Sequence, residues 1–440
     1  MGSNGEQPPK PWVQTPLIRS AALSLEAGWY LCSLLPFYPS CLLTARSNIY
    51  LKLETLQPSG SFKSRGIGNL MSKALLSHPP SKPVHFYCSS GGNAGLACVT
   101  AATALHRPAT IVVPMSTSAL MVQKLKALGA DVVQHGMHWS EADTFLREQL
   151  LARDEGGVYV PPFDHGDLWE GHSSLVDEVE MQMRGLGKEY DAIVCSVGGG
   201  GLFAGVMEGL ERHGRLRGGK RAEVKVLVME TEGADSLNFS LREGELRRLD
   251  AITSIATSLG AAQVARKAYE WGQRPEVQSC VFSDAEAAMA CVKFADDERI
   301  VVESACGVSI APAYNDTLHT LLYPELSDEE FAEINVVIVV CGGSNVTLKV
   351  LEGYKEKYGR DERVITKFHS RRLGTREKLP MKARKHSGVP FVMHDRVQHV
   401  ELEDEPPCDE TKLPKKPAIG MMEKVEVDKQ VQEFGKVVEV

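Results

Sequence analysis

The sequence lacks several features that would indicate an exported, zinc-binding or membrane-spanning protein. Its ten cysteines include no CxxC pair, so neither a zinc site nor a disulfide framework is indicated. The N-terminus does not combine a basic start with an apolar run, as a secretory signal would. The apolar stretch 29–43 is shorter than the roughly 20 residues of a membrane helix, and Pro36 and Pro39 interrupt it.

An excess of positive charge is also missing. The formal net charge of the 440 residues is −8, which argues against a protein that binds nucleic acid through a basic surface. Hydrophobic residues make up 43% of the chain, enough to bury the core of two or three domains. We therefore expect a cytoplasmic protein that acts on a small molecule and has no nucleic-acid or membrane partner.

From Asn48 onward, short β-rich runs alternate with helical patterns. This alternation is typical of an α/β fold with mostly parallel sheets flanked by helices. The clearest predicted strands are 84–88, 110–113, 131–134, 193–197, 225–230 and 335–340. Helices are predicted over 94–105 and 118–128, and another is expected to open at Leu202.

Lys63 lies in the segment Pro58-Ser-Gly-Ser-Phe-Lys-Ser-Arg-Gly66. A single lysine is usually a solvated surface residue, but three glycine-rich turns follow this one, each where a strand is expected to pass into a helix. The four glycines 198–201 come after an apolar run and leave their backbone N–H groups unobstructed at a helix start. Together these features predict an amine that forms a Schiff base beside a phosphate site.

The other two turns are less specific. Residues 89–95, Ser-Ser-Gly-Gly-Asn-Ala-Gly, offer hydroxyl, amide and backbone donors that could hold a substrate carboxylate, although an ordinary helix cap has the same composition. Cys341 opens the third turn, 341–345, at the end of a predicted buried strand. Ligands bind at such strand ends in open α/β sheets, but a buried cysteine is more often an inert apolar residue.

A rival interpretation is a dinucleotide site. Residues 199–204 match the pattern GxGxxA, and Glu230 ends the next predicted strand, where a ribose-binding acid could lie. Any run of glycines produces this pattern, and the interpretation leaves the lysine segment unexplained.

Taken together, the segments PSGSFKSRG, SSGGNAG, SVGGGG and CGGSN occur in an order and spacing that resemble the fold-type II, or tryptophan-synthase-β-like, pyridoxal-phosphate enzymes. Within that family the chain most resembles the L-serine/L-threonine dehydratases, over about residues 15–358. The resemblance implies two open twisted sheets, pyridoxal 5'-phosphate as cofactor, a homodimer and a role in amino-acid catabolism.

The resemblance also implies a role for each matching residue. Lys63 would carry the cofactor and Phe62 would lie against one face of its ring, with Ser258 on the other. Asn93 would contact the ring hydroxyl and Cys341 the ring nitrogen. The phosphate would be held by Gly198, Gly199, Gly200 and Gly201, and the substrate carboxylate by Ser90, Gly91 and Asn93. A monovalent cation, expected to be K⁺, would take oxygens from Glu230, Ala234, Ser236, Leu259 and Ala261.

The implied reaction is the elimination of water from L-serine, which gives pyruvate and ammonia, or from L-threonine, which gives 2-oxobutyrate and ammonia. The freed amine of Lys63 would be the base that takes the α-proton. A threonine synthase, cysteine synthase or amino-acid racemase would share the lysine and the glycine turns, and a thiol at Cys341 favours the dehydratases. A nicotinamide-dependent oxidoreductase and a non-catalytic relative remain open.

The predicted domain organisation has a small domain, 57–163, inserted into a larger one made of 1–56 and 164–363, with the cofactor in the cleft between them. Two segments depart from the family pattern. Residues 28–47 form an atypical, aromatic and cysteine-rich insertion, and 364–440 form a C-terminal extension with segregated charge that is predicted to be disordered.

Overall fold

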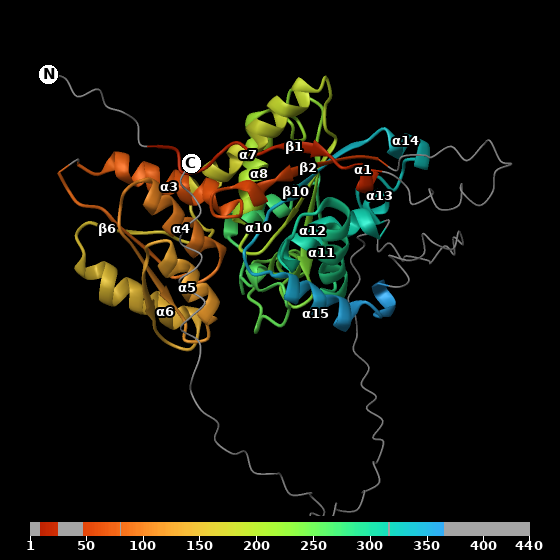
Figure 1. Ribbon diagram of the computed structural model, residues 1–440. Helices are drawn as coiled ribbons and strands as arrows, with labels where there is room; N and C mark the ends of the chain where they lie inside the picture. Colours follow the sequence, from red (N-terminus) through yellow and green to blue (C-terminus); the bar gives the residue numbers. More distant parts are fainter. Residues whose placement is uncertain (1–8, 25–46, 80, 316, 365–440) are drawn as a thin grey trace, which may run out of the picture. The chain divides into compact units, whose positions relative to one another are not determined.

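Two separate sheets organise the chain (Figure 1). The computed structural model describes residues 9–24, 47–79, 81–315 and 317–364, all of which belong to one unit spanning 1–377. A six-stranded sheet has the order β1-β2-β10-β7-β8-β9, and a four-stranded sheet has the order β5-β4-β3-β6. The predicted α/β class, with mostly parallel sheets flanked by helices, is confirmed.

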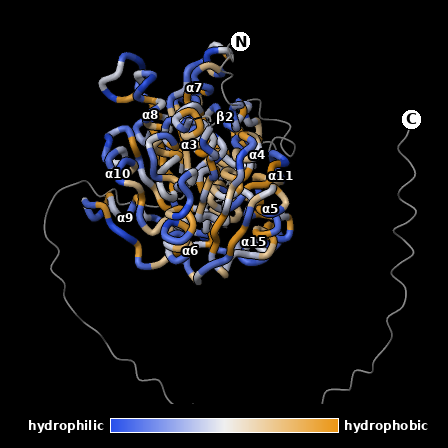
Figure 2. The backbone as a smooth tube through the Cα atoms, turned by 90° about the vertical axis from the view of Figure 1, so that its left-hand side faces the viewer, coloured by the Kyte–Doolittle hydropathy of each residue, from blue (hydrophilic) through white to orange (hydrophobic). Residues whose placement is uncertain are grey.

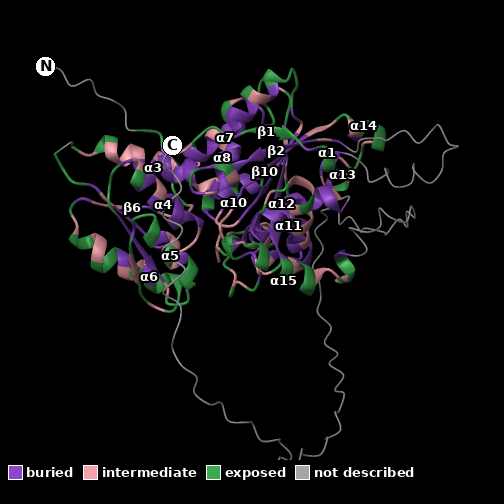
Figure 3. Ribbon diagram, in the orientation of Figure 1, coloured by how far each residue is buried: buried purple, intermediate pink, exposed green. Residues whose placement is uncertain are grey.

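The larger sheet is parallel except at one edge. β10 lies between β2 and β7 and pairs in parallel with both, whereas β1 pairs antiparallel with β2. Its central strands are continuous apolar runs because helices cover both faces of a parallel sheet, and Figure 3 shows β2 and β10 as buried. The strands are β1 Leu17–Arg19, β2 Asn48–Leu53, β7 Ala192–Ser196, β8 Lys225–Thr231, β9 Val277–Phe282 and β10 Asn335–Val340.

The smaller sheet is wholly parallel, with β3 and β4 at its centre. Its strands are β3 His85–Cys88, β4 Ala109–Val113, β5 Asp131–Gln134 and β6 Gly157–Tyr159. The helices that accompany this sheet in the sequence are α3 Lys63–Ser77, α4 Asn93–Ala104, α5 Ala119–Ala127 and α6 Trp139–Phe145, followed by the short turns η2 Leu146–Leu150 and η3 Leu151–Arg153.

The remaining helices accompany the larger sheet. They are α1 Ala21–Ser24, η1 Glu54–Leu56, α7 Gly166–Gly185, α8 Gly201–Arg212, α9 Ser236–Glu243, η4 Thr257–Leu259, α10 Arg266–Gly272, α11 Asp284–Glu298, α12 Ser304–Tyr314, α13 Thr317–Leu322, α14 Asp328–Ala332 and α15 Leu348–Tyr358. Figure 2 shows hydrophilic loops beside α9 and α10 on the outside of the chain. No helix among the described residues is long and apolar enough to cross a membrane.

Helix α7 packs closely on α3 and α8, and glycines make the approach possible. A Cβ atom at Gly66 of α3 would lie 2.5 Å from the ring of His172, and one at Gly205 of α8 would lie 2.4 Å from the Cβ of His172. On α7 itself, a Cβ at Gly171 would lie 2.5 Å from the carbonyl oxygen of Arg65. The three helices are therefore in close contact around the buried side chain of His172.

Most of the predicted elements occur where the sequence placed them. Strands 131–134 and 335–340 have the predicted limits, and the ends of the other strands shift by at most one residue. The predicted split at 57 and 163 stays a prediction, although the smaller sheet falls entirely within that interval. The atypical segment 28–47 and the extension 364–440 lie outside the described residues, apart from Ser47 and Val364.

The position of β10 gives a test of where the core lies. Ile338 is fully buried at the centre of β10, whereas 70% of Leu348 is exposed on α15. Ile338→Ala should lower the free energy of unfolding by about 2–5 kcal/mol, because it leaves a cavity between packed helices and sheet. Denaturant titration measures this loss, and the matched variant Leu348→Ala should cost far less. Equal losses would contradict the central position of β10.

Candidate active site

Lys63 is the first residue of α3, and the loop before it is fixed to the end of β10. The backbone N–H of Phe62 donates to the carbonyl of Cys341 at 3.1 Å, and that of Gly343 donates to the carbonyl of Gly60 at 3.0 Å. Ser61 and Gly342 form an isolated β-bridge. The lysine segment and the third glycine turn, far apart in the sequence, are thus joined by backbone hydrogen bonds.

The side chain of Lys63 points from this junction toward buried groups of both sheets. Its amine donates to the carbonyl of Pro162 at 2.5 Å. Burial lowers the pKa of Lys63 to about 8, while Cys88, Cys341 and Glu303 act in the opposite direction. A lysine with this pKa is partly uncharged near neutral pH, as a nucleophile or base requires.

Asn93 connects the second glycine turn to the same place. Its amide donates to Glu303 at 2.8 Å and to the hydroxyl of Ser258 at 3.3 Å, and its oxygen accepts from the backbone of Ser344 at 3.0 Å. Glu303 is buried, and burial raises its pKa. Its second oxygen accepts from the backbone of Asn345 at 3.2 Å. Three other segments of the chain therefore converge on the Asn93 amide.

Cys341 follows β10 and is buried. Its sulfur lies 3.5 Å from the hydroxyl of Ser196 at the end of β7, a distance that allows a weak hydrogen bond to sulfur. Cys306, the third residue of α12, is buried beside it, and burial together with the hydrogen bond to Cys341 raises the pKa of Cys306. The thiol of Cys341 thus stands among weakly polar neighbours, with no carboxylate hydrogen-bonded to it among the described residues.

The four glycines 198–201 form a tight turn at the start of α8. Gly200 caps the helix in the left-handed region with φ +89°, which a side chain would strain. A Cβ at Gly199 would lie 2.2 Å from the ring of Phe163, and one at Gly198 would lie 2.8 Å from the Cα of Leu259. A helix N-terminus with bare backbone of this kind is a site for an anion.

The turn that contains Ser90 is also closely packed. The hydroxyl of Ser90 accepts from the backbone of Gly92 at 3.3 Å. A Cβ at Gly91 would lie 2.9 Å from a methyl group of Thr117, and one at Gly95 would lie 1.9 Å from the carbonyl oxygen of Ser90. The glycines let this backbone fold tightly over the start of α4, beside Asn93.

A second group of predicted residues gathers near the end of β8. Glu230 is fully buried, and burial raises its pKa to about 8. Its two carboxylate oxygens accept from the backbone N–H groups of Leu237 and Asn238 at 2.9 and 2.8 Å. The hydroxyl of Ser236 is buried without a hydrogen-bond partner. Both carboxylate oxygens of Glu230 therefore bind the first turn of α9.

Comparison with known proteins decides the family. Residues 13–342 match the profile described as "Pyridoxal-phosphate dependent enzyme", three quarters of the chain. The chain belongs to the pyridoxal-phosphate-dependent enzymes. One relative is the catabolic L-serine/threonine dehydratase of Saccharomyces cerevisiae, which is 39% identical over 72% of this chain and 87% of the relative. Another is the L-serine dehydratase/L-threonine deaminase of Homo sapiens, which is 40% identical over 80% of this chain and 97% of the relative.

A solved structure agrees with this assignment. The fungal L-serine ammonia-lyase from Rhizomucor miehei superposes on this enzyme with a TM-score of 0.66 and 32% sequence identity, covering 79% of this chain and 99% of the other. The predicted family is thereby confirmed, and the nicotinamide alternative loses its support.

The residues present fit the cofactor. The glycine turn at α8 would accommodate a phosphate, the partly uncharged amine of Lys63 suits the aldehyde, and the thiol of Cys341 is a weakly polar partner for a ring nitrogen. Hydrogen bonds connect Asn93 to Ser258, and backbone contacts connect Phe62 to Cys341. The individual roles of these residues and of Ser90 and Gly91 stay predictions.

Two residues of the site were not predicted. Glu303, the N-cap of α12, accepts hydrogen bonds from Asn93 and from the 341–345 turn, and its only sequence signal is an acidic residue before a helix. His172 lies against Phe62 with ring centroids 4.9 Å apart, and neither ring nitrogen has a partner among the described residues. Burial keeps the pKa of His172 well below its ordinary value, so the ring is uncharged.

The lowered pKa of Lys63 predicts how cofactor capture depends on pH. In cofactor-free protein, the rate at which Lys63 bonds covalently to added pyridoxal phosphate should rise with pH and level off above about 8, because only the uncharged amine reacts. An unperturbed lysine would give a midpoint near 10.4. Stopped-flow absorbance measures the rate, and a midpoint near 10 would contradict a desolvated amine at this half-buried position.

Proposed function

We propose that this enzyme eliminates water from L-serine and L-threonine and releases ammonia with pyruvate or 2-oxobutyrate. The proposal rests on two neighbouring residues. Burial lowers the pKa of Lys63 to about 8, and backbone hydrogen bonds join its segment to the turn that begins with the thiol residue Cys341. The names of the relatives and of the fungal ammonia-lyase support the substrate class.

The cofactor, when bound, withdraws electrons from the bonds to the α-carbon of the amino acid. Lys63 takes the α-proton onto its amine, for which the lowered pKa suits it. The β-hydroxyl then departs as water, and hydrolysis of the released product yields the 2-oxoacid and ammonia. Ser90, Gly91 and Asn93 would orient the substrate carboxylate, since they surround the N-terminus of α4.

The neighbours of Cys341 favour elimination over the other reactions of the family. A carboxylate beside the ring nitrogen would hold a proton there and strengthen the electron sink. The groups around this thiol are the hydroxyl of Ser196 and the thiol of Cys306. A weaker sink leaves less time for racemisation or transamination before the β-hydroxyl departs.

We further propose a K⁺ site formed by Glu230 and Ser236 with the backbone of Ala234, Leu259 and Ala261. In support, Glu230 and Ser236 are fully buried, and the Ser236 hydroxyl has no partner in the described structure. A hard cation bound by these oxygens would satisfy the hydroxyl and neutralise the carboxylate. The site would stiffen the loop that carries Ser258.

A homodimer in the cytoplasm, with two domains that close over the substrate, completes the proposal. Two sheets with separate cores support the domain division. A role in amino-acid catabolism and gluconeogenesis would follow from the products.

Lys63 gives the direct test of the reaction. Purified wild type should release pyruvate from L-serine. Lys63→Ala should lose the covalent bond to the cofactor, and its turnover rate should fall by about 1000-fold or more, because the nucleophile and the base are the same group. Absorption spectra before and after borohydride, with a coupled pyruvate assay, measure both. The matched control Lys73→Ala removes a lysine of the same helix that is paired with Asp167 and Glu170 at the surface. Normal pyruvate release by Lys63→Ala would overturn the proposal.

The cation site predicts a response to salt. Saturating K⁺, compared with tetramethylammonium at equal ionic strength, should raise the thermal midpoint of the wild type, because a ligand at 100 times its dissociation constant adds about 2.7 kcal/mol to the free energy of unfolding. Binding should strengthen as pH rises through about 8, because the carboxylate of Glu230 then loses its proton. Glu230→Gln should abolish most of the response, whereas Glu276→Gln, another buried carboxylate, should keep it. The same response in both variants would place the cation elsewhere.

A further inference from the structure

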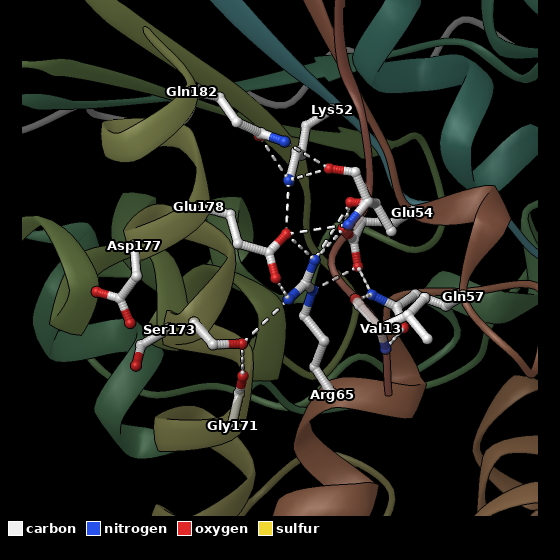
Figure 4. A network of polar contacts seen from close by, with 12 residues as sticks. Val13, Lys52, Glu54, Gln57, Arg65, Gly171, Ser173, Asp177, Glu178 and Gln182 are labelled. Atoms are coloured by element: carbon white, nitrogen blue, oxygen red, sulfur yellow. Dashed lines mark hydrogen bonds and ion pairs between the residues drawn. The ribbon is translucent and has the colours of Figure 1, made fainter. Parts of the chain in front are cut away.

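Arg65 is the centre of a buried polar network that no step of the proposed reaction uses (Figure 4). Its guanidinium makes two hydrogen bonds of 2.7 Å to Glu54 and two more of 2.7 Å to Glu178. Weaker bonds reach the hydroxyls of Ser174 and Thr15 at 3.1 and 3.2 Å. All three nitrogens of the side chain are occupied, and the residue is fully buried.

A second cation balances the charges. The amine of Lys52 donates to Glu178 at 2.7 Å, to the carbonyl of Thr15 at 2.7 Å and to Gln182 at 2.9 Å. Two cations therefore face two carboxylates, and Lys52, Glu54 and Arg65 are wholly shielded from solvent. Burial works against the charged forms, but the carboxylates outweigh it and raise the pKa of Arg65.

The partners of Arg65 come from separate parts of the fold. Glu54 follows β2 of the larger sheet, and Glu178 lies on α7, which also packs on α8 with its glycine turn. Arg65 itself is in the first turn of α3, two residues after Lys63. The network thus ties the turn that carries Lys63 to both the sheet and the helix that supports the phosphate site.

We propose that Arg65 is a positioning residue, whose double clamp on Glu54 and Glu178 holds the amine of Lys63 at the spacing from the glycine turn that one cofactor molecule requires. This inference rests on the proposed function of Lys63. Arginine suits the task because its planar fork binds two carboxylates in a fixed orientation, which a lysine cannot do. A buried ion network contributes little net stability compared with apolar packing, so its main effect is geometric.

A charge-balanced double variant separates geometry from stability. Arg65→Met with Glu54→Gln removes one cation and one carboxylate, and it leaves the ion pair between Lys52 and Glu178. We expect a folded protein in which cofactor capture and turnover fall about 10- to 100-fold, because a displacement of about 1 Å has that effect on a reacting group. The pH midpoint of capture should also move above 8, as the amine of Lys63 becomes more exposed to water.

The matched control is a second buried arginine that contacts a glutamate of the same helix, α7. Arg215 is equally buried and contacts Glu180 of α7 at 3.5 Å and Glu189 at 2.5 Å. Arg215→Met with Glu180→Gln also removes one cation and one carboxylate, and it leaves Arg221 paired with Glu189. This variant should keep the wild-type capture rate and pH midpoint, whatever happens to its thermal midpoint.

Cofactor capture by the wild type and by both double variants decides the inference. Loss of capture with a shifted pH midpoint in the Arg65 variant alone supports it. Wild-type capture in the Arg65 variant, or equal losses in both variants, overturns it and leaves the proposed function standing. If wild-type protein itself captures no pyridoxal phosphate, the proposed function fails first. Should the double variant not fold, Arg65→Lys keeps the charge and loses the fork, and wild-type capture by it would refute the clamp.

Discussion

The insertion of β10 between β2 and β7 is the constraint on which the site depends. Parallel pairing on both sides aligns the carboxyl ends of the three strands at one edge of the sheet, where ligands of open α/β sheets bind. Cys341 leaves β10 at that edge, next to Ser196 at the end of β7, and the backbone beyond it bonds to the loop before Lys63. Without this order of strands, the amine and the thiol would belong to different parts of the molecule.

Buried ionisable groups follow from the same arrangement. Burial lowers the pKa of Lys63 and raises the pKa of Glu303 and of Glu230, so it favours the uncharged form of all three. Arg65, by contrast, stays charged because two carboxylates surround it. Near the Lys63 amine, burial thus favours uncharged forms, whereas the Arg65 guanidinium keeps its charge because Glu54 and Glu178 pair with it. Reactivity and rigidity are supplied by neighbouring residues of one helix, α3.

Local patterns in the sequence were enough for the elements, whereas the roles of most site residues rested on the family resemblance and stay predictions. Apolar runs predicted strands such as 335–340. Glycines predicted the turns at Gly91 and Gly200, because a side chain there would clash with neighbouring atoms. Long-range partners were out of reach. Glu303 meets Asn93 across 210 residues, and Glu178 meets Arg65 across 113, and no local rule relates such positions. His172 of α7, packed against Gly66 of α3 and Gly205 of α8, has no local sequence signal either.

The late position of β10 in the sequence also bears on how the protein is made. Ser344, just beyond that strand, bonds to an Asn93 that is synthesised 251 residues earlier. A nascent chain can form β3, β4 and the helix that begins with Lys63, but the thiol and its turn are still missing from it. The enzyme acquires a complete cofactor site only when nearly all of its folded part has left the ribosome. Chains that end before β10 therefore carry Lys63 without the turn at Cys341 that completes the site.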